Sequence, residues 1–280
     1  MYELYELDEL GTPCAEEISP DCIVFDVDGV LVESRTSYQE VIRRVVEREW
    51  EKTGRNADKA GYSPELNYVM KNHGSFNDDY DIIWALLNIA FASEREKLSE
   101  ALPPPGEMRE MFAPYKGECA AWIPKLARIK FDIAAVRIWG QEIYAGDGDE
   151  PGLWTLDRPM LAVDWKRLPL PACVYTGRDL KEWRLAQKTL SWRDFPDERA
   201  VRVDMGIKKP SAKGLEYFCR KFGHERPIYF GDTAGDKLSY EEFGRGWFAA
   251  IGDTIPDAGM RFPDVKTALR TILNWDADVQ

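Results

Sequence analysis

The sequence predicts an α/β fold in which a parallel sheet carries an inserted, mainly helical domain. Apolar runs at 22–25, 172–175 and 227–230 are short enough to be strands buried on both faces of such a sheet. From residue 170 onwards helical patterns alternate with strands, and this alternation implies right-handed crossovers. The stretch 34–169 is helical in pattern and carries no comparable strand. We therefore predict a Rossmann-like parallel sheet with an insertion after its first strand.

Residues 1–20 are predicted to form an acidic N-terminal extension. The chain of 280 residues has a formal charge of −12, and residues 1–21 contain seven acids but neither Lys nor Arg. Nucleic-acid binding requires a basic face, and nothing in the sequence indicates one. The length is sufficient for one large domain or two modest ones.

The cysteines and the hydropathy pattern indicate the cellular compartment. The five cysteines are an odd number without a C-x-x-C pair, and Cys22 and Cys173 fall in predicted strands, where a thiol acts as a small apolar group. No run of 18 apolar residues exists, and the acidic start differs from the basic start of a signal peptide. We expect a soluble, cytoplasmic protein without disulfides and without a membrane partner.

Start and stop signals divide the insertion into helices. Ser37–Glu40 has the pattern of a capping box and predicts the start of the first helix. Ser63–Pro64 predicts a second start, with Pro at the first helical position, and a third helix is expected to be capped by Asn77 or Asp78. The Pro-Pro-Pro-Gly run at 103–106 ends the pattern, and further helix is expected from 122 to 144.

The second part of the sheet follows the insertion. Strands and helices are expected in this order: strand 172–175, helix 180–190, strand 200–203, helix 211–222, strand 227–230, strand 247–251, and a last helix capped by Asp264 and ending at Leu273.

Polar residues follow the first strand. Asp26 and Asp28 come directly after the run 22–25, and Gly29 allows the chain to curl. Ligands of open α/β sheets bind beyond the carboxyl ends of the strands, so both acids are candidate site residues. The alternative is an Asp-Gly turn with two solvated carboxylates.

Three further stretches lie just past a strand or open a helix. Thr176 and Gly177 follow the strand 172–175, where backbone amides can approach an anion; the alternative is an ordinary turn. Lys209, or Lys208 if the register differs by one, precedes a helix start that attracts phosphate; the alternative is a solvated basic pair.

The fourth stretch follows the strand 227–230. Asp232 and Asp236 lie four residues apart across a loop and a helix start, as an oxygen-rich Mg²⁺ site can require. The alternative is one N-capping aspartate and one surface aspartate.

In this order the four stretches resemble the motifs D-x-D-G, T-G, K-P and G-D-x-x-x-D of the haloacid dehalogenase (HAD) superfamily. The resemblance covers residues 22–34 and 170–275. It implies a HAD-like hydrolase core at 21–33 and 170–280. The insert 34–169 would be a helical cap of the C1 type, as in subfamily I of this superfamily, which closes over the site as a lid.

The resemblance also implies roles for individual residues. Asp26 would attack phosphorus and form an aspartyl phosphate, and Asp28 would act first as general acid and then as general base. Thr176, Gly177 and Lys209 would hold the transferring phosphoryl group.

The implied cofactor is Mg²⁺. Asp26, the backbone carbonyl of Asp28, and Asp232 would be its ligands, and Asp236 would orient them. The cation and a lysine are needed because a phosphate dianion repels the attacking carboxylate.

The residues that would select the substrate are less well defined. The segment 74–81 resembles a G-G-F-N-N-D-W-D-like segment of a little-characterised HAD subgroup, which makes Asn77, Asp78 and Asp79 candidates; the alternative is a capping loop with solvated acids. Arg178 is predicted either to contact substrate or to form an ion pair on its own helix.

The resulting prediction is a Mg²⁺-dependent phosphomonoester hydrolase acting on a small phosphorylated metabolite. A phosphomutase of the same superfamily would use every catalytic residue named above. A binding protein that has lost catalysis is the alternative from another class. The sequence indicates neither the identity of the substrate nor the oligomeric state.

Overall fold

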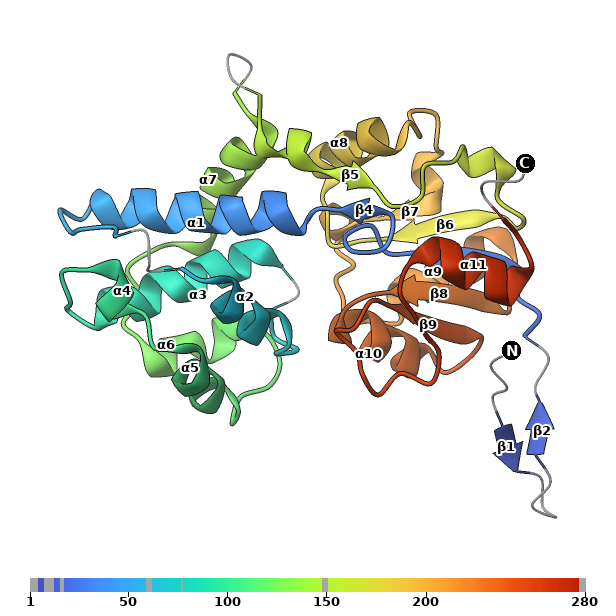
Figure 1. Cartoon of the computed structure of the whole chain (residues 1–280), viewed down its shortest axis with the longest axis horizontal. Coiled ribbons are helices and arrows are strands. Elements are labelled where there is room, and N and C mark those ends of the chain that lie inside the picture. Colours follow the sequence, from blue (N-terminus) through green and yellow to red (C-terminus); the bar gives the residue numbers. More distant parts are fainter. Residues whose placement is uncertain are drawn as a thin grey trace. The chain divides into compact units, whose positions relative to one another are not determined.

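The chain folds into two compact units, which a computed structural model describes over residues 5–7, 13–15, 18–58, 62–76, 78–147 and 151–276 (Figure 1). Unit 1 comprises Met1–Glu33 and Arg158–Gln280, and unit 2 comprises Ser34–Asp157. Among the helices of these ranges, none combines the length and the apolar character needed to cross a bilayer.

Unit 1 is built on a six-stranded sheet in which every neighbouring pair is parallel. The strand order is β10-β9-β8-β3-β6-β7. This sheet confirms the α/β fold class. Its strands are β3 (Cys22–Phe25), β6 (Ala172–Tyr175), β7 (Ala200–Val201), β8 (Pro227–Gly231), β9 (Trp247–Ile251) and β10 (Arg261–Phe262).

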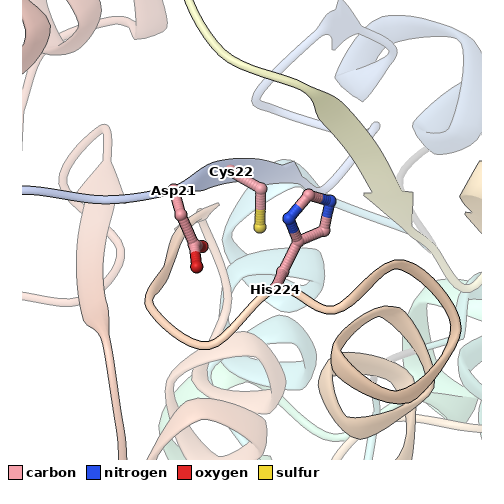
Figure 2. A group of neighbouring side chains, drawn as sticks. All are labelled: Asp21, Cys22 and His224. Atoms are coloured by element: carbon pink, nitrogen blue, oxygen red, sulfur yellow. The ribbon is translucent and has the colours of Figure 1, made fainter.

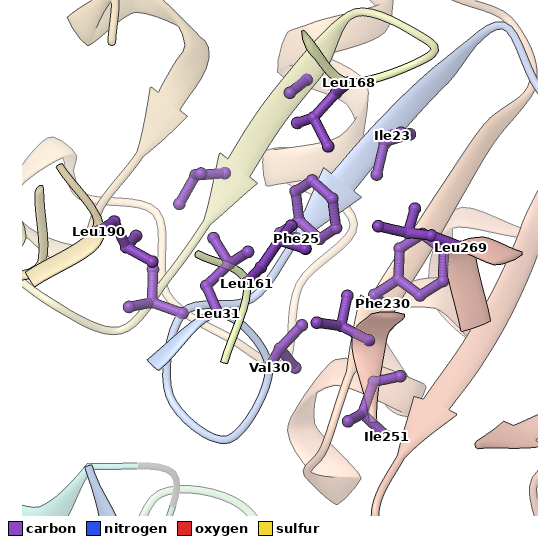
Figure 3. Close-up of a cluster of buried hydrophobic side chains, with 14 of the residues drawn as sticks. Ile23, Phe25, Val30, Leu31, Leu161, Leu168, Leu190, Phe230, Ile251 and Leu269 are labelled. Carbon is purple, nitrogen blue, oxygen red and sulfur yellow. The ribbon is translucent and has the colours of Figure 1, made fainter. Parts of the chain in front are cut away.

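Helices cover both faces of this sheet. They are α8 (Leu180–Leu190), α9 (Lys213–Phe222), α10 (Ala234–Phe243) and α11 (Val265–Leu273). Side chains of β3 alternate between the faces. Ile23 and Phe25 pack with residues of α8 and α11 (Figure 3), whereas Cys22 and Val24 pack with residues of α9. Burial on both faces explains why β3 is an uninterrupted apolar run.

A short antiparallel ladder joins the two stretches of chain in unit 1 that flank unit 2. Strand β4 (Val32–Glu33) pairs with β5 (Arg158–Pro159), and Leu161 is fully buried in the core of the sheet. Residues 158–169, which the sequence pattern assigned to the insertion, therefore pack with unit 1.

The remaining elements of unit 1 are short. An antiparallel pair consists of β1 (Tyr5–Leu7) and β2 (Pro13–Ala15). The 3₁₀ turns are η3 (Trp165–Arg167), η4 (Asp197–Arg199) and η5 (Val203–Met205). Because η5 begins at Val203, strand β7 is shorter than predicted.

Unit 2 is helical. Its elements are α1 (Arg35–Glu51), α2 (Pro64–Lys71), α3 (Asp79–Ala92), α4 (Leu98–Ala101), α5 (Pro105–Phe112), η1 (Cys119–Ala121), α6 (Ile123–Leu126), α7 (Ile133–Ala145) and η2 (Leu153–Leu156). Every residue of α3 from Tyr80 to Ala90 is buried. A helix buried on all sides is the centre of its domain, and α3 has this place in unit 2.

Two of the three predicted helix starts in unit 2 are confirmed. Ser63 accepts a hydrogen bond from the amide of Leu66, and Asp78 accepts one from the amide of Tyr80. The capping box at Ser37 is wrong, because α1 already begins at Arg35. The Ser37 hydroxyl instead bonds the carbonyl of Ser34 and the carboxylate of Asp157.

The single helical stretch expected from 122 to 144 is divided in the structure. Helix α6 ends at Leu126, and α7 begins after its N-cap Asp132. Between them the chain is bound to α3: the amides of Lys130 and Phe131 donate to the side-chain carbonyl of Asn88, and the indole of Trp84 donates to the carbonyl of Phe131. These hydrogen bonds satisfy backbone groups of residues 130–131 that no helix pairs, and so stabilise the break between α6 and α7.

Candidate active site

Asp26 lies at the carboxyl end of the central strand. Its amide donates to the carbonyl of Phe230 at 2.9 Å, which continues the pairing of β3 with β8. Its side chain is buried, and its Oδ1 is 2.6 Å from Nζ of Lys209. The same ammonium is 2.5 Å from Oδ1 of Asp236. One buried lysine therefore bridges two buried carboxylates, one that follows β3 and one in the first turn of α10.

The carboxylate of Asp236 is held on both oxygens. Oδ1 accepts from the hydroxyl of Tyr229 as well as from Lys209. Oδ2 accepts from the Thr233 hydroxyl at 2.6 Å and from the amides of Thr233 and Asp232 at 3.0 and 3.2 Å. A carboxylate with this many donors has little freedom to turn, which suits a group that orients its neighbours.

The pKa values of Asp26, Asp236 and Lys209 are shifted in different directions by their buried surroundings. Burial raises the pKa of Asp26 above its usual range; Lys209 opposes the increase, and Asp236 and Asp28 add to it. Burial also disfavours the charged form of Asp236, but Lys209 and the hydrogen bonds hold the pKa of Asp236 below its usual range. For Lys209, burial is outweighed by Asp236 and Asp26, which raise its pKa. Lys209 and Asp236 thus favour each other's charged forms, whereas burial disfavours the charged form of Asp26.

Two glycines allow the acids to come close together. Gly29 has φ +74°, and a Cβ there would lie 2.1 Å from Oδ2 of Asp232. A Cβ at Gly231 would lie 2.3 Å from Cβ of Asp236. With both positions open, one oxygen each of Asp26, Asp232 and Asp236 lies within 4.8 Å of the others. This cluster consists of carboxylates alone and can hold a metal ion.

Thr176 lies at the end of β6, the neighbour of β3. Its amide donates to the carbonyl of Val201 at 3.0 Å, and its hydroxyl accepts from the amide of Arg178 at 3.1 Å. A Cβ added to Gly177 would meet no atom within 4 Å, so this position is sterically open. Of the two candidate lysines, Lys209 is buried beside Asp26, whereas Lys208 is exposed.

Asp28 has a partner that the sequence reasoning missed. The guanidinium of Arg178 donates from Nε to Oδ2 of Asp28 at 3.0 Å and from Nη2 to Oδ1 at 2.6 Å. The predicted partner of Arg178 was either substrate or a residue of its own helix. The sequence does indicate that Arg178 and Asp28 each follow a strand at the same edge of the sheet. Their contact can be inferred only once β6 is known to lie beside β3.

The candidate substrate residues of unit 2 have partners within that unit. Asp78 caps α3 and forms an ion pair with Arg137. Asp79 accepts from Nζ of Lys71 at 2.9 Å. Asn77 lies outside the described residues. A role of these residues in substrate binding stays a prediction.

A second group of potential metal ligands lies at the amino ends of β3 and β8. Asp21, Cys22 and His224 each offer one atom within 4.8 Å of the others (Figure 2). The carboxylate of Asp21 accepts from the amides of Glu225 and Arg226 at 2.7 and 3.1 Å, and so holds the chain before β8 against the start of β3. Burial raises the pKa of the Cys22 thiol far above its usual range, and a protonated thiol is a poor ligand. These contacts indicate a structural role.

Residues 20–244 match the family of haloacid dehalogenase-like hydrolases. The chain belongs to this family, which confirms the resemblance found in its motifs. The four motif stretches lie within the matched range.

Solved structures extend the comparison. The chain is similar to phosphatase Tt82 from Thermococcus thioreducens, with 27% identity and a TM-score of 0.65 over 90% of this chain and 99% of that one. A HAD-superfamily hydrolase of subfamily IA, variant 1, from Geobacter sulfurreducens has 17% identity and a TM-score of 0.52 over 90% and 96% of the two chains. A conserved haloacid dehalogenase-like protein of unknown function from Agrobacterium tumefaciens has 14% identity and a TM-score of 0.52 over 91% and 99%. The last two likenesses concern the fold alone. Curated proteins gave no match.

Proposed function

We propose that this protein is a phosphatase that hydrolyses a small phosphomonoester through an aspartyl phosphate on Asp26. The observation that carries the proposal is the buried group of Asp26, Lys209 and Asp236 at the carboxyl end of the central strand, with Asp28 two residues further on. Burying charges of this kind is energetically costly, and such groups are found most often at functional sites. The family of the chain and its similarity to a phosphatase support the same reaction.

The residues present fit a divalent cation, and we propose Mg²⁺. The donor set of Asp26, Asp232 and Asp236 consists of carboxylate oxygens, which Mg²⁺ prefers, and lacks the imidazole and thiolate that favour zinc. Asp26, Asp232 and the carbonyl of Asp28 would hold the ion, and Asp236 would orient this shell. When bound, the ion neutralises phosphate oxygens and keeps Asp26 ionised.

The chain's own residues would carry out two half-reactions. In the first, an oxygen of Asp26 bonds to phosphorus while the bond from phosphorus to the leaving alcohol breaks, and Asp28 gives the alcohol oxygen its proton. In the second, water attacks phosphorus and gives its proton to Asp28. The bond from phosphorus to Asp26 breaks, its electron pair returns to the carboxylate, and inorganic phosphate leaves. Thr176, Gly177 and Lys209 hold the phosphoryl oxygens.

Unit 2 is proposed to act as the cap that selects the substrate. A phosphomutase would use the same catalytic residues but transfer the phosphoryl group from the enzyme to a hydroxyl of a phosphorylated substrate instead of to water. It would therefore release little inorganic phosphate. Phosphate release from a panel of phosphorylated metabolites therefore separates the two activities.

The experiment that tests the function uses p-nitrophenyl phosphate and Mg²⁺. The wild-type chain should release p-nitrophenolate and phosphate in equal amounts, and chelation should stop this until Mg²⁺ is added back. Asp26→Asn should abolish both turnover and acid-stable, hydroxylamine-sensitive label on the protein. Asp164→Asn, a change at an exposed carboxylate in unit 1, is the matched control and should have no effect. Label on the Asp26 variant, or full activity without metal, would overturn the proposal.

A further inference from the structure

We propose that Arg178 is a positioning residue that holds the carboxylate of Asp28 in the orientation needed for proton transfer. This inference rests on the function proposed above and adds to it a residue that the family motifs do not include. The motif at this point is T-G, and the arginine follows it.

The contact between the two residues is bidentate. Nε and Nη2 of one planar guanidinium each bind a different oxygen of Asp28, at 3.0 and 2.6 Å. Two parallel charge-assisted hydrogen bonds fix both the position and the plane of a carboxylate. Each carboxylate oxygen can accept more than one hydrogen bond, so the contact with Arg178 does not by itself prevent either oxygen from exchanging a proton with substrate or water.

The burial of the two side chains shows that Arg178 is the rigid partner and Asp28 the one that it restrains. The side chain of Arg178 is 1% exposed, whereas that of Asp28 is 36% exposed. The guanidinium is also tied to the first turn of α8, where Nη1 donates to the carbonyl of Glu182 at 3.3 Å. A buried arginine anchored to a helix is rigid, so it restrains the partly exposed aspartate.

The arginine also connects two parts of the site. Its amide donates to the hydroxyl of Thr176 at 3.1 Å, and its carbonyl accepts from the amide of Val203 at 3.3 Å. The loop that presents Thr176 to the phosphoryl group therefore also positions the carboxylate that exchanges the proton. A shift of about 1 Å in such a group can lower a rate about 100-fold, so the restraint has a measurable consequence.

The two half-reactions depend on Asp28 to different degrees. When p-nitrophenyl phosphate phosphorylates Asp26, the leaving phenolate departs without a proton. When water attacks the aspartyl phosphate, its proton must pass to Asp28. Losing the position of Asp28 should therefore slow the second half-reaction and spare the first.

The test is rapid-quench kinetics of Arg178→Gln with p-nitrophenyl phosphate and Mg²⁺. We expect dephosphorylation to slow by about 100-fold. Phosphorylation should change by less than about 5-fold, so that a burst of p-nitrophenolate appears and the aspartyl phosphate accumulates. Arg178→Lys keeps a charge but makes no bidentate contact, and should lie between the wild type and Arg178→Gln. Arg199→Gln, at the amino end of β7, where the arginine Nη1 bonds the carbonyl of Ala172, is the matched control and should alter neither step.

A double-mutant cycle shows whether Arg178 acts through Asp28. In an Asp28→Asn background, Arg178→Gln should cause no further loss of rate, because there is no carboxylate left to position. An equal loss in both backgrounds would overturn the proposal. Weaker inhibition by inorganic phosphate in Arg178→Gln would also overturn it, since it would place Arg178 on the substrate. Equal slowing of both half-reactions with a lowered melting temperature would show a structural role only. A wild-type protein that forms no aspartyl phosphate would instead remove the proposed function itself.

Discussion

Replacing Gly29 by alanine should separate metal binding from stability. Gly29 has φ +74°, and its missing Cβ leaves the space that Oδ2 of Asp232 occupies, 2.1 Å from where a Cβ would lie. Gly223, the C-cap of α9, has nearly the same φ of +73°, but a Cβ there meets nothing within 4 Å. The two substitutions therefore share the backbone strain and differ in the clash.

The shared cost follows from the backbone. An alanine in the left-handed region destabilises the folded state by about 1–2 kcal/mol. Replacing glycine also lowers the conformational entropy of the unfolded chain, which offsets about 0.4–1 kcal/mol of this. Both variants should lose about 1 kcal/mol of unfolding free energy. The clash at Gly29 is with the side chain of Asp232, whose Oδ2 and Cγ would lie 2.1 and 2.6 Å from the new Cβ. Rotation of this side chain relieves both contacts, so the clash should add little to the loss of stability.

The clash should instead appear in metal binding. Carbon and oxygen atoms at van der Waals contact lie about 3.5 Å apart, so Oδ2 of Asp232 must withdraw by more than about 1 Å. Metal–ligand distances tolerate only about 0.2 Å. Gly29→Ala should therefore weaken Mg²⁺ binding by at least about 10-fold, a loss that even outer partners of a metal site can cause.

Calorimetric titration of the chelator-treated proteins with Mg²⁺, and urea unfolding of the metal-free proteins, measure the two quantities. Gly223→Ala should bind Mg²⁺ as the wild type does. If Gly29→Ala also does so, Asp232 is not a ligand. If it loses several kcal/mol more stability than Gly223→Ala, the side chain does not turn away, and the steric argument fails.

Two further predictions concern the stability of unit 2. Arg43, and to a lesser degree Arg44, lowers the pKa of Glu40 to about 2 from 4.5; a carboxylate with a depressed pKa stabilises the fold above pH 4.5 and loses this effect as the pH falls toward 2. Because the group is partly exposed, Glu40→Gln should cost less than about 1 kcal/mol at pH 7 and still less at pH 3, and urea unfolding that shows a pH-independent cost would contradict this. Asp157 is buried and accepts from the hydroxyls of Ser37 and Tyr144, so Asp157→Ala should cost about 3 kcal/mol. A loss below about 1 kcal/mol in the same assay would show that the two hydroxyls find other acceptors.

Elements whose signals are local were predictable from the sequence. Helix α8 runs from Leu180 to Leu190 as expected, and the structure shows that the contacts at its start, a capping box of Asp179 and Glu182, lie within four residues. The cap at Asp264 and the start of α3 after Asp78 are confirmed for the same reason. Five of the six strands of the sheet were found, because burial leaves an apolar run that polar residues end. The edge strand β10 was not predicted, since its two residues, Arg261 and Phe262, form no such run.

Features that depend on distant partners were not predictable. Ser37 has the pattern of a cap, yet its hydroxyl bonds Asp157, 120 residues away in the chain. The partner of Arg178 is 150 residues away and becomes a neighbour only through the order of the strands. The motif residues could be named individually, but the sequence did not indicate that Lys209 bridges Asp26 and Asp236 or that Tyr229 binds the second of these acids.

The charges at the carboxyl ends of the strands explain why the proposed reaction would require a cation. Four carboxylates, those of Asp26, Asp28, Asp232 and Asp236, face the two cations Lys209 and Arg178, and each cation is already paired. A phosphomonoester dianion would add two negative charges to this group. Repulsion of that size in a buried site is strong, and burial together with Asp236 and Asp28 raises the pKa of Asp26 although Lys209 opposes the increase. A divalent cation held by Asp26 and Asp232 would offset the excess of two carboxylates and favour the ionised form of Asp26, which the proposed nucleophilic role requires.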